Sequence, residues 1–140
     1  MSRLIVAAII TGPADTVLAS ARAYPPDLAG RYEFPGGKVE PGEDAATALR
    51  RELAEELCVC AQIGPELANP DRADGLWPIL EGRDMRVLWA RIPEGAEPAV
   101  TAAHLHHVWQ PRTHLADLDW LAPDLPIARL IARKSPPNVP

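Results

Sequence analysis

The sequence predicts an α/β domain with a mixed β-sheet, and three observations support that prediction. Short apolar runs bounded by turn residues are typical of buried strands. Residues 44–57 contain neither proline nor glycine, and their apolar residues have the spacing of an amphipathic helix. Closely spaced strands predict hairpins, which favour a mixed sheet over a doubly wound one. The chain has 140 residues, enough for one domain.

The elements before this helix are expected to be strands and one long loop. Leu4 to Ile10 is a continuous apolar run, typical of a buried strand. The turn Gly12 to Asp15 connects it to a second strand at Thr16 to Ala21, which completes a hairpin. Tyr24 to Gly37, rich in proline and glycine, is expected to be a loop, and Lys38 to Glu40 a short strand.

The helix and the elements after it complete the predicted domain, which spans residues 1–134. Asp44 stands where an N-cap belongs. The apolar stripe consists of Ala45, Leu49, Leu53 and Leu57. Later strands are expected at residues 59–63, 76–80, 85–92 and 105–109, with a turn at 82–84. Pro126 fits the first turn of a closing helix at 127–134, and residues 135–140 are expected to be a frayed tail.

The composition argues against several classes of protein. An apolar fraction of 47% and a charged fraction of 24% rule out wholesale disorder. The net charge of -5 disfavours binding to a nucleic-acid polymer. Cys58 and Cys60 alone form neither a disulfide framework nor a zinc site, and no apolar run reaches the roughly 20 residues of a membrane span. We expect a cytoplasmic monomer or homodimer without a signal peptide or membrane partner.

Three glutamates carry the first candidate site. At about 100° per residue, Glu52, Glu55 and Glu56 lie on one side of the helix, beside its apolar stripe. Like charges at this spacing repel by about a few tenths of a kcal/mol, and a divalent cation such as magnesium or manganese offsets that repulsion. For three glutamates alone, a solvated acidic face is the alternative interpretation.

The residues before and within the helix favour the metal site. Gly36 and Gly37 let the backbone approach a ligand and permit a positive φ, and Lys38 offers a point charge to phosphate. Arg51 lies one turn before Glu55 and can orient that carboxylate by a charged hydrogen bond. A glycine loop, a lysine and an acidic helix in one short stretch together favour a metal and phosphate site over a solvated acidic face.

This stretch resembles the signature of the Nudix hydrolases. The matching residues are Gly37, Glu43 and the run Arg51-Glu52-Leu53-Ala54-Glu55-Glu56-Leu57. Cys58 replaces the signature glycine that normally ends the helix, so Cys58 must adopt a left-handed conformation or the helix must end differently. The flank from Leu28 to Glu40 is similar to the MutT-like nucleoside triphosphate pyrophosphohydrolases, which include enzymes for oxidised dGTP and for CTP.

The resemblance implies a fold, a cofactor and a set of roles. The fold is the Nudix α/β/α sandwich, with a mixed sheet and a catalytic loop-helix-loop. The implied ligands of Mg²⁺, or of Mn²⁺ as a substitute, are Glu52, Glu55, Glu56 and the carbonyl of Gly36. Glu52 or a neighbour is the implied general base, and Arg51 orients the carboxylates. Gly37 and Glu43 are supporting residues, and Glu43 either supports the loop or reaches metal-bound water.

Other positions keep two interpretations each. Arg22 matches a phosphate-contacting position of relatives, or it is an exposed arginine at a strand end. Many relatives carry a further metal-binding glutamate before the late strand, where this chain has no acid but His104, His106 and His107. A histidine can replace that glutamate as ligand or base, or play a structural role. Alternation places His104 and His106 on one strand face and His107 on the other.

The base-binding end of the site is less determined. Asp124, in an Asp-x-Pro element, matches a residue that hydrogen-bonds the base in MutT-like enzymes, or it is the N-cap of the last helix. An ionised Asp124 only accepts hydrogen bonds, which suits cytosine or guanine, whereas a protonated one also donates and admits oxidised purines. Phe34, Trp109 and Trp120 can stack on a base or belong to the core. Trp77 and Trp89 are expected to be packing residues.

Three functions follow from these residues. The leading one is a magnesium-dependent pyrophosphohydrolase that converts (d)NTP and water to (d)NMP and pyrophosphate, in sanitation of 8-oxo-dGTP or in (d)CTP turnover. The second is a Nudix hydrolase of another nucleoside diphosphate derivative, such as ADP-ribose or a nucleotide sugar. The third is a non-catalytic nucleotide-binding module, which is disfavoured because every signature glutamate is present.

Overall fold

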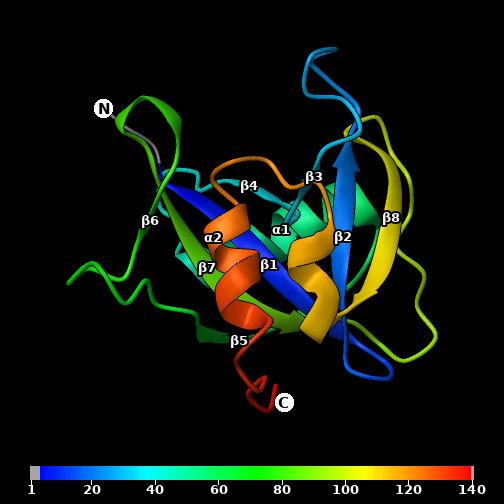
Figure 1. Ribbon diagram of the computed structural model, residues 1–140. Coiled ribbons are helices and arrows are strands. Elements are labelled where there is room, and N and C mark those ends of the chain that lie inside the picture. The colour runs from blue at the N-terminus through cyan, green and yellow to red at the C-terminus, as the bar shows by residue number, and fades with distance from the viewer. Residues whose placement is uncertain (1–3, 140) are drawn as a thin grey trace.

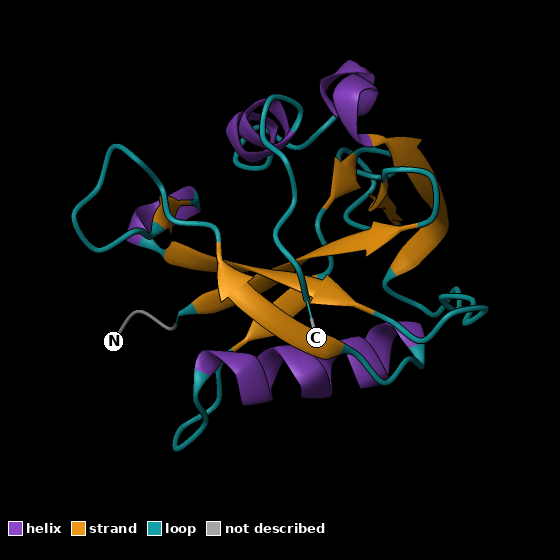
Figure 2. Cartoon of the chain, turned by 90° about the horizontal axis from the view of Figure 1, so that it is seen from below, coloured by secondary structure: helices purple, strands orange, loops and turns teal. Residues whose placement is uncertain are grey.

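Helices cover both faces of one mixed sheet in the computed structural model, which describes residues 4–139 (Figure 1). Helix α1 (Ala45–Leu57) covers one face. Helix α2 (Leu125–Ile131) and the 3-10 helix η2 (Arg112–Asp117) lie on the other face (Figure 2). This arrangement confirms the predicted α/β/α sandwich with a mixed sheet. In the described part of the chain, no helix has the length and apolar character needed to cross a membrane.

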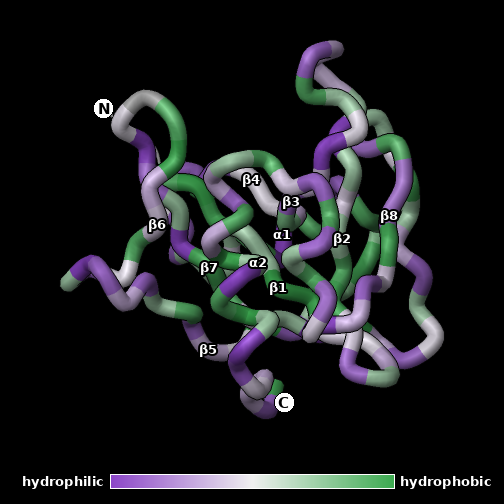
Figure 3. The backbone as a smooth tube through the Cα atoms, in the orientation of Figure 1, coloured by the Kyte–Doolittle hydropathy of each residue, from purple (hydrophilic) through white to green (hydrophobic). Residues whose placement is uncertain are grey.

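Strand β1 (Ile5–Gly12) forms the centre of the sheet. It pairs in parallel with β7 (Asp84–Arg91), and antiparallel with β2 (Thr16–Arg22) and β4 (Gly36–Lys38). The remaining strands are β3 (Tyr32–Glu33), β5 (Gln62–Glu66), β6 (Trp77–Pro78) and β8 (His104–Pro111). Figure 3 shows β1 as hydrophobic over most of its length, as expected for a strand covered on both faces.

Alternate residues of β1 contribute to two separate cores. Val6, Ala8 and Ile10 pack with α1 residues in one core, whereas Ala7 and Ile9 pack with α2 residues in the other. The α1 residues are Ala48, Leu49, Leu53 and Leu57, and the α2 residues are Ile127, Ala128 and Ile131. The predicted apolar stripe of α1 is therefore the surface that fixes this helix to the sheet.

Both ends of α1 are as the sequence indicates. Asp44 caps the first turn, and its Oδ1 accepts a hydrogen bond of 2.7 Å from the backbone N–H of Thr47. Cys58 ends the helix with φ 56° and ψ 39°, the left-handed conformation that a glycine adopts most readily. Its N–H still donates to the carbonyl of Ala54 at 3.1 Å. The chain therefore keeps the helix end of the signature without its glycine.

Several predicted boundaries differ from the structure. The short strand expected at residues 38–40 is β4 at 36–38, because Gly36 and Gly37 pair with β1. The strand expected at residues 59–63 begins only at Gln62, since Val59 and Ala61 pack beneath α1 as connecting chain. The strand expected at 76–80 stops at Pro78 and is followed by a 3-10 turn, η1 (Leu80–Gly82). The elements β3 and η2 are not predicted.

The segment after residue 134 is anchored at one point. The sequence predicts a frayed tail, but Val139 is buried in the α2 core. Its side chain lies so close to Gly64 that a Cβ there would come within 2.8 Å of it. Pro140 lies outside the described residues. Trp77 and Trp89 are buried in the same core, as expected.

Candidate active site

A cavity of about 660 Å³ opens beside β4 and the inner side of α1. Glu33, Lys38 and Glu56 line it towards the helix, and Asp124 lines it towards the start of α2. Arg22 contributes a further cation from the end of β2. The volume falls within the range of about 300–1,000 Å³ that small-molecule sites occupy.

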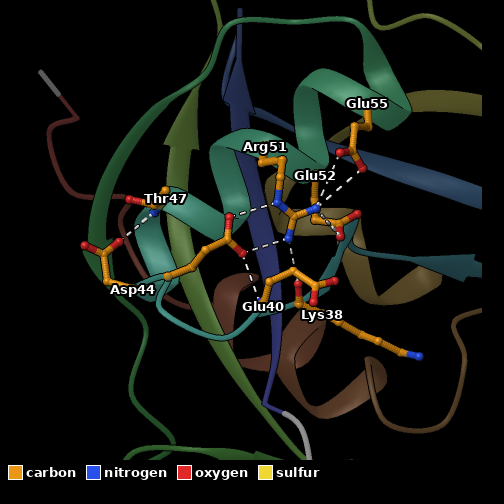
Figure 4. A network of polar contacts seen from close by, with 8 residues as sticks. Lys38, Glu40, Asp44, Thr47, Arg51, Glu52 and Glu55 are labelled. Atoms are coloured by element: carbon orange, nitrogen blue, oxygen red, sulfur yellow. Dashed lines mark hydrogen bonds and ion pairs between the residues drawn. The ribbon is translucent and has the colours of Figure 1, made fainter.

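Arg51 contacts three carboxylates, one just before α1 and two on it (Figure 4). Its guanidinium donates twice to Glu43, at 2.9 Å to each oxygen, and at 3.0 Å to Glu52 Oε1. Longer contacts of 3.5 Å reach both oxygens of Glu55. Arg51 also donates to the carbonyl of Lys38 at 3.0 Å, which joins the helix to the glycine loop. The predicted contact to Glu55 is present, but the bonds to Glu43 and Glu52 are shorter.

Glu43 supports the loop before α1. The hydrogen bonds from Arg51 and from the backbone N–H of Glu40 lower the pKa of Glu43 to about 2, so this carboxylate is charged at neutral pH. Of its two predicted roles, loop support is the one for which the structure provides contacts. The ammonium end of Lys38 extends away from this network in Figure 4.

The two loop glycines are needed for close approach. A Cβ at Gly36 would overlap the carbonyl oxygen of Val6, and a Cβ at Gly37 would overlap the carboxylate of Glu52. Both glycines also permit a positive φ, but neither adopts one. Gly37 therefore serves by letting the Glu52 carboxylate lie directly over the loop backbone.

Glu56 differs from the other helix glutamates because it enters the cavity. Burial, helped by the nearby charges of Glu33, Glu52 and Glu55, raises its pKa to about 7, although His104 opposes the shift. Its Oε1 is buried and has no hydrogen-bond partner. Among residues 4–139, no three histidine, cysteine or carboxylate side chains are grouped to hold a metal ion as they stand. Of the helix glutamates, Glu52 and Glu55 therefore contact Arg51, whereas Glu56 lines the cavity.

A second polar network in the cavity lining surrounds Glu33. Arg22 Nη1 lies 3.2 Å from Glu33 Oε1, and His104 Nε2 lies 2.9 Å from Glu33 Oε2. Arg22 also donates to the carbonyl of Tyr24 at 2.9 Å, so it is bound at the strand end rather than free in solvent. Sequence reasoning missed Glu33, and its only signal was its place in the flank that resembles the MutT-like branch.

The three late-strand histidines have different surroundings. His106 faces Tyr32, with Nε2 2.9 Å from the hydroxyl, and His107 bonds Ser20 Oγ at 2.8 Å and the carbonyl of Ala99 at 2.9 Å. Burial lowers the pKa of His107. The predicted alternation is wrong, because the rings of His104 and His107 are in contact with centroids 5.2 Å apart. A register shift opposite Ala21 and Arg22 breaks the period of two.

Asp124 turns towards Phe34 rather than capping α2. Its Oδ1 accepts a hydrogen bond of 3.2 Å from the backbone N–H of Phe34, and it makes no side-chain cap bond. Burial outweighs that hydrogen bond and raises the pKa of Asp124 to about 7. The ring of Phe34 stacks on Trp120, with centroids 4.5 Å apart. Trp109 lies outside the cavity and packs against Gly12, because β8 carries it to the far end of β2.

Comparison with known proteins agrees with this geometry. The model of the NUDIX domain matches residues 1–133. The chain belongs to the Nudix hydrolase family. A Mycobacterium tuberculosis H37Rv protein provisionally named 8-oxo-dGTP diphosphatase 2 is 40% identical to it over 139 residues, covering 87% of each chain. The CTP pyrophosphohydrolase of Escherichia coli K12 is 47% identical over 68 residues, 49% of this chain and 50% of that protein.

Solved structures show the same Nudix architecture. The Escherichia coli ORF135 protein superposes with a TM-score of 0.72 at 29% identity, over 91% of this chain and 86% of that one. The MutT protein of Methanosarcina mazei Go1 superposes with a TM-score of 0.75 at 18% identity, over 94% of both chains. In this Nudix chain, the signature residues are those that surround Arg51 and the glycine loop.

Proposed function

We propose that this Nudix hydrolase is a nucleoside triphosphate pyrophosphohydrolase, which converts (d)NTP and water to (d)NMP and pyrophosphate. The observation that carries the proposal is one cavity lined by Glu56, Lys38, Arg22 and the buried Asp124. Relatives named 8-oxo-dGTP diphosphatase and CTP pyrophosphohydrolase support a nucleotide substrate. The proposed roles are sanitation of the cytoplasmic nucleotide pool or (d)CTP turnover, by a monomer or homodimer that binds no nucleic-acid polymer.

The proposed cofactor is Mg²⁺, with Mn²⁺ as a substitute. The ligands would be Glu52, Glu55, Glu56 and the carbonyl of Gly36. These donors are all oxygens, which suit hard divalent cations, and the unpartnered Oε1 of Glu56 is the most direct support for a cation at this place. When bound, the cation supplies positive charge to the phosphates and acidifies water.

The residues of the chain hold and orient the reactants. Lys38 and Arg22 would bind phosphate oxygens, since both line the cavity and carry positive charge. Arg51 keeps Glu43, Glu52 and Glu55 oriented by charged hydrogen bonds. Glu52 or a neighbouring glutamate would take the proton of the attacking water.

Asp124 is the proposed contact to the base. Because its pKa is raised to about 7, both protonation states are accessible near neutral pH. The ionised carboxylate accepts from the amino group of cytosine or from the N1–H and N2–H₂ of guanine, whereas the protonated form also donates to an oxidised purine. Phe34 holds Asp124 through its backbone N–H and would meet the base from the same wall.

A substrate panel tests the proposal. The purified protein is incubated with (d)NTPs, including 8-oxo-dGTP, CTP and 5-methyl-dCTP, and with ADP-ribose, with and without Mg²⁺, and pyrophosphate and monophosphate are measured. We expect pyrophosphate release that EDTA abolishes and added Mg²⁺ restores. Activity that survives both EDTA and Glu52→Gln would contradict the mechanism. Release of monophosphate from ADP-ribose but from no triphosphate would contradict the substrate class.

Matched variants separate the site from the surface. Glu52→Gln should lower kcat by at least about a hundredfold, because a general base contributes at least that much. Glu94→Gln is the control, since Glu94 is exposed in the loop after β7 and lies outside the cavity lining. Its kcat should equal that of the unchanged protein. Equal losses in both variants would place the effect outside the proposed site.

A further inference from the structure

A column of aromatic rings lies behind the proposed base-binding end of the cavity. Phe34 lines the cavity, whereas Trp120 is buried and does not line it. The two rings stack with centroids 4.5 Å apart and 25° between their planes, and the ring of Tyr32 lies 6.3 Å from that of Trp120. Because Trp120 is covered, it cannot stack on a base directly, and any effect on the base passes through Phe34.

Three hydrogen bonds fix Trp120 in this position. Its Nε1–H donates to the carbonyl of Leu115 at 2.7 Å within the buried core. The N–H of Tyr32 donates to the carbonyl of Asp119 at 2.9 Å, and the N–H of Leu121 donates to the carbonyl of Tyr32 at 2.9 Å. These two bonds pair the chain on either side of Trp120 with β3, which leads into the cavity wall. The indole is therefore fixed relative to that wall by both its side chain and its backbone.

The segment that carries Trp120 also carries Asp124. The N–H of Asp124 donates to the carbonyl of Leu121 at 2.9 Å, and its Oδ1 accepts from the N–H of Phe34 at 3.2 Å. Phe34 and Asp124 thus lie on two distant segments of the chain, and Trp120 connects them. It contacts Phe34 by ring stacking and is joined to Asp124 by a short stretch of backbone. A shift of the indole would therefore move Phe34 relative to Asp124.

We propose that Trp120 is a positioning residue for base recognition, which holds the ring and the N–H of Phe34 against the carboxylate of Asp124. This role rests on the proposed function, since Phe34 and Asp124 are its proposed contacts to the base. Stacked aromatic pairs contribute more than the area that they bury, and packing from behind keeps contact groups within about 0.5 Å of their working positions. Because the base is remote from the reacting phosphorus, the role predicts an effect on binding rather than on the chemical step.

Two substitutions of Trp120 separate the ring from its hydrogen bond. Trp120→Phe keeps a ring for Phe34 but loses the Nε1–H, whereas Trp120→Met fills the core without a ring. Discrimination is measured as the ratio of kcat/KM for the two best nucleotides of the panel that differ in base. Losing one hydrogen bond to the base corresponds to about a tenfold change. We expect Trp120→Met to raise KM and to lower discrimination about tenfold, with kcat changed less than about threefold. Trp120→Phe should keep KM and discrimination within about threefold of the unchanged protein.

Trp77→Met is the matched control. Trp77 is buried in the same core, its Nε1–H donates to the carbonyl of Leu67 at 3.0 Å, and it does not line the cavity. Its substitution should lower the midpoint of urea unfolding, as Trp120→Met does, but leave discrimination unchanged. Equal losses of discrimination in the two variants, or a loss of kcat alone in Trp120→Met, would contradict the positioning role.

Amide hydrogen exchange tests the support of Phe34 without any substrate. In the unchanged protein, the Phe34 amide should be protected from exchange like that of Ala8, which donates to the carbonyl of Pro35 at 2.8 Å. Trp120→Met should lower the protection of Phe34 relative to Ala8 about tenfold, and Trp77→Met should leave that ratio unchanged.

An unprotected Phe34 amide in the unchanged protein, or a constant ratio in Trp120→Met, would overturn the proposal whatever the substrate is. The first of these readouts needs no variant, so it decides even where Trp120→Met does not fold. If the unchanged protein hydrolyses none of the nucleotides, the proposed function fails, whereas the exchange ratio still decides whether Trp120 positions Phe34.

Discussion

Two groups of acidic residues in this protein have pKa values shifted in opposite directions, although all of them are carboxyl groups. The outer group, Glu43, Glu52 and Glu55, surrounds Arg51. The inner group lines the cavity, where Asp124 is buried and Glu56 is half-buried. Arg51 lowers the pKa of Glu43 to about 2, whereas burial raises the pKa values of Glu56 and Asp124 to about 7. A neighbouring cation keeps a carboxyl group ionised at neutral pH. Burial instead raises its pKa, so that its protonation state depends on pH in the neutral range.

The largest expected effect comes from removing the cation of the outer group. Arg51→Ala should lower kcat by a factor of about 100 to 1,000, because the carboxylates lose the donor that orients them. Arg51→Lys should restore only part of kcat, since an ammonium cannot contact Glu43 and Glu52 in the same fork. Steady-state kinetics on the preferred nucleotide measure both. The neighbouring exposed Arg50→Ala is the control, and equal losses at both positions would contradict the comparison.

The inner group should reveal itself in the pH dependence of stability. Between the ordinary pKa of an aspartate and about 7, the unfolded chain loses a proton that the native Asp124 keeps, so stability falls as pH rises. Asp124→Asn removes this contribution and keeps an acceptor for Phe34. From pH 5 to pH 8, the variant should gain about 2 kcal/mol in unfolding free energy relative to the unchanged protein, by urea denaturation. A pH-independent difference would argue against a buried titrating group.

Gly37→Ala provides an intermediate effect on the outer group. The new Cβ displaces the Glu52 carboxylate, which is the movable end of a side chain. We expect kcat to fall about tenfold while the unfolding free energy changes by less than about 1 kcal/mol. Kinetics and urea denaturation on the same preparation separate the two. Gly36→Ala is the contrasting variant, because its Cβ meets the backbone of Val6 and should lower stability first.

The smallest expected effect lies at the helix end, away from both groups. Cys58→Gly relieves the left-handed conformation at φ 56° and should raise the unfolding free energy by about 1 kcal/mol. Cys60→Ser, at an exposed neighbouring position, should stay within about 0.5 kcal/mol of the unchanged protein. Urea denaturation measures both. A loss of stability in Cys58→Gly would mean that the thiol makes a compensating contact.

The two groups also differ in how well the sequence predicts them. The outer group comes from one continuous stretch, so helical spacing and the resemblance identify Glu43, Arg51, Glu52 and Glu55 together. The inner group depends on contacts between distant segments, such as Phe34 with Asp124. Sequence patterns therefore left the N-cap alternative open for Asp124. Helical spacing placed Glu56 beside the apolar stripe but did not separate it from Glu52 and Glu55.

Local irregularities account for the remaining errors in the fold. The register shift opposite Arg22 places His104 and His107 on one side, which simple alternation cannot foresee. Strand β4 consists of two glycines and a lysine, which are residues that strands disfavour. Strand propensity therefore does not predict its pairing with β1. By contrast, the hairpin of β1 and β2 and the bounds of α1 depend on nearby residues, and the sequence predicts both.

The parallel pairing of β1 with β7 determines when this chain can complete its sheet during synthesis. Ile5 pairs with Met85 and Thr11 with Arg91. Strand β1 therefore cannot pair with β7 until most of the protein has left the ribosome. Until then the β1–β2 hairpin exposes an apolar edge that can pair with other chains. Nascent chains halted before Arg91 should therefore be the species most prone to aggregate.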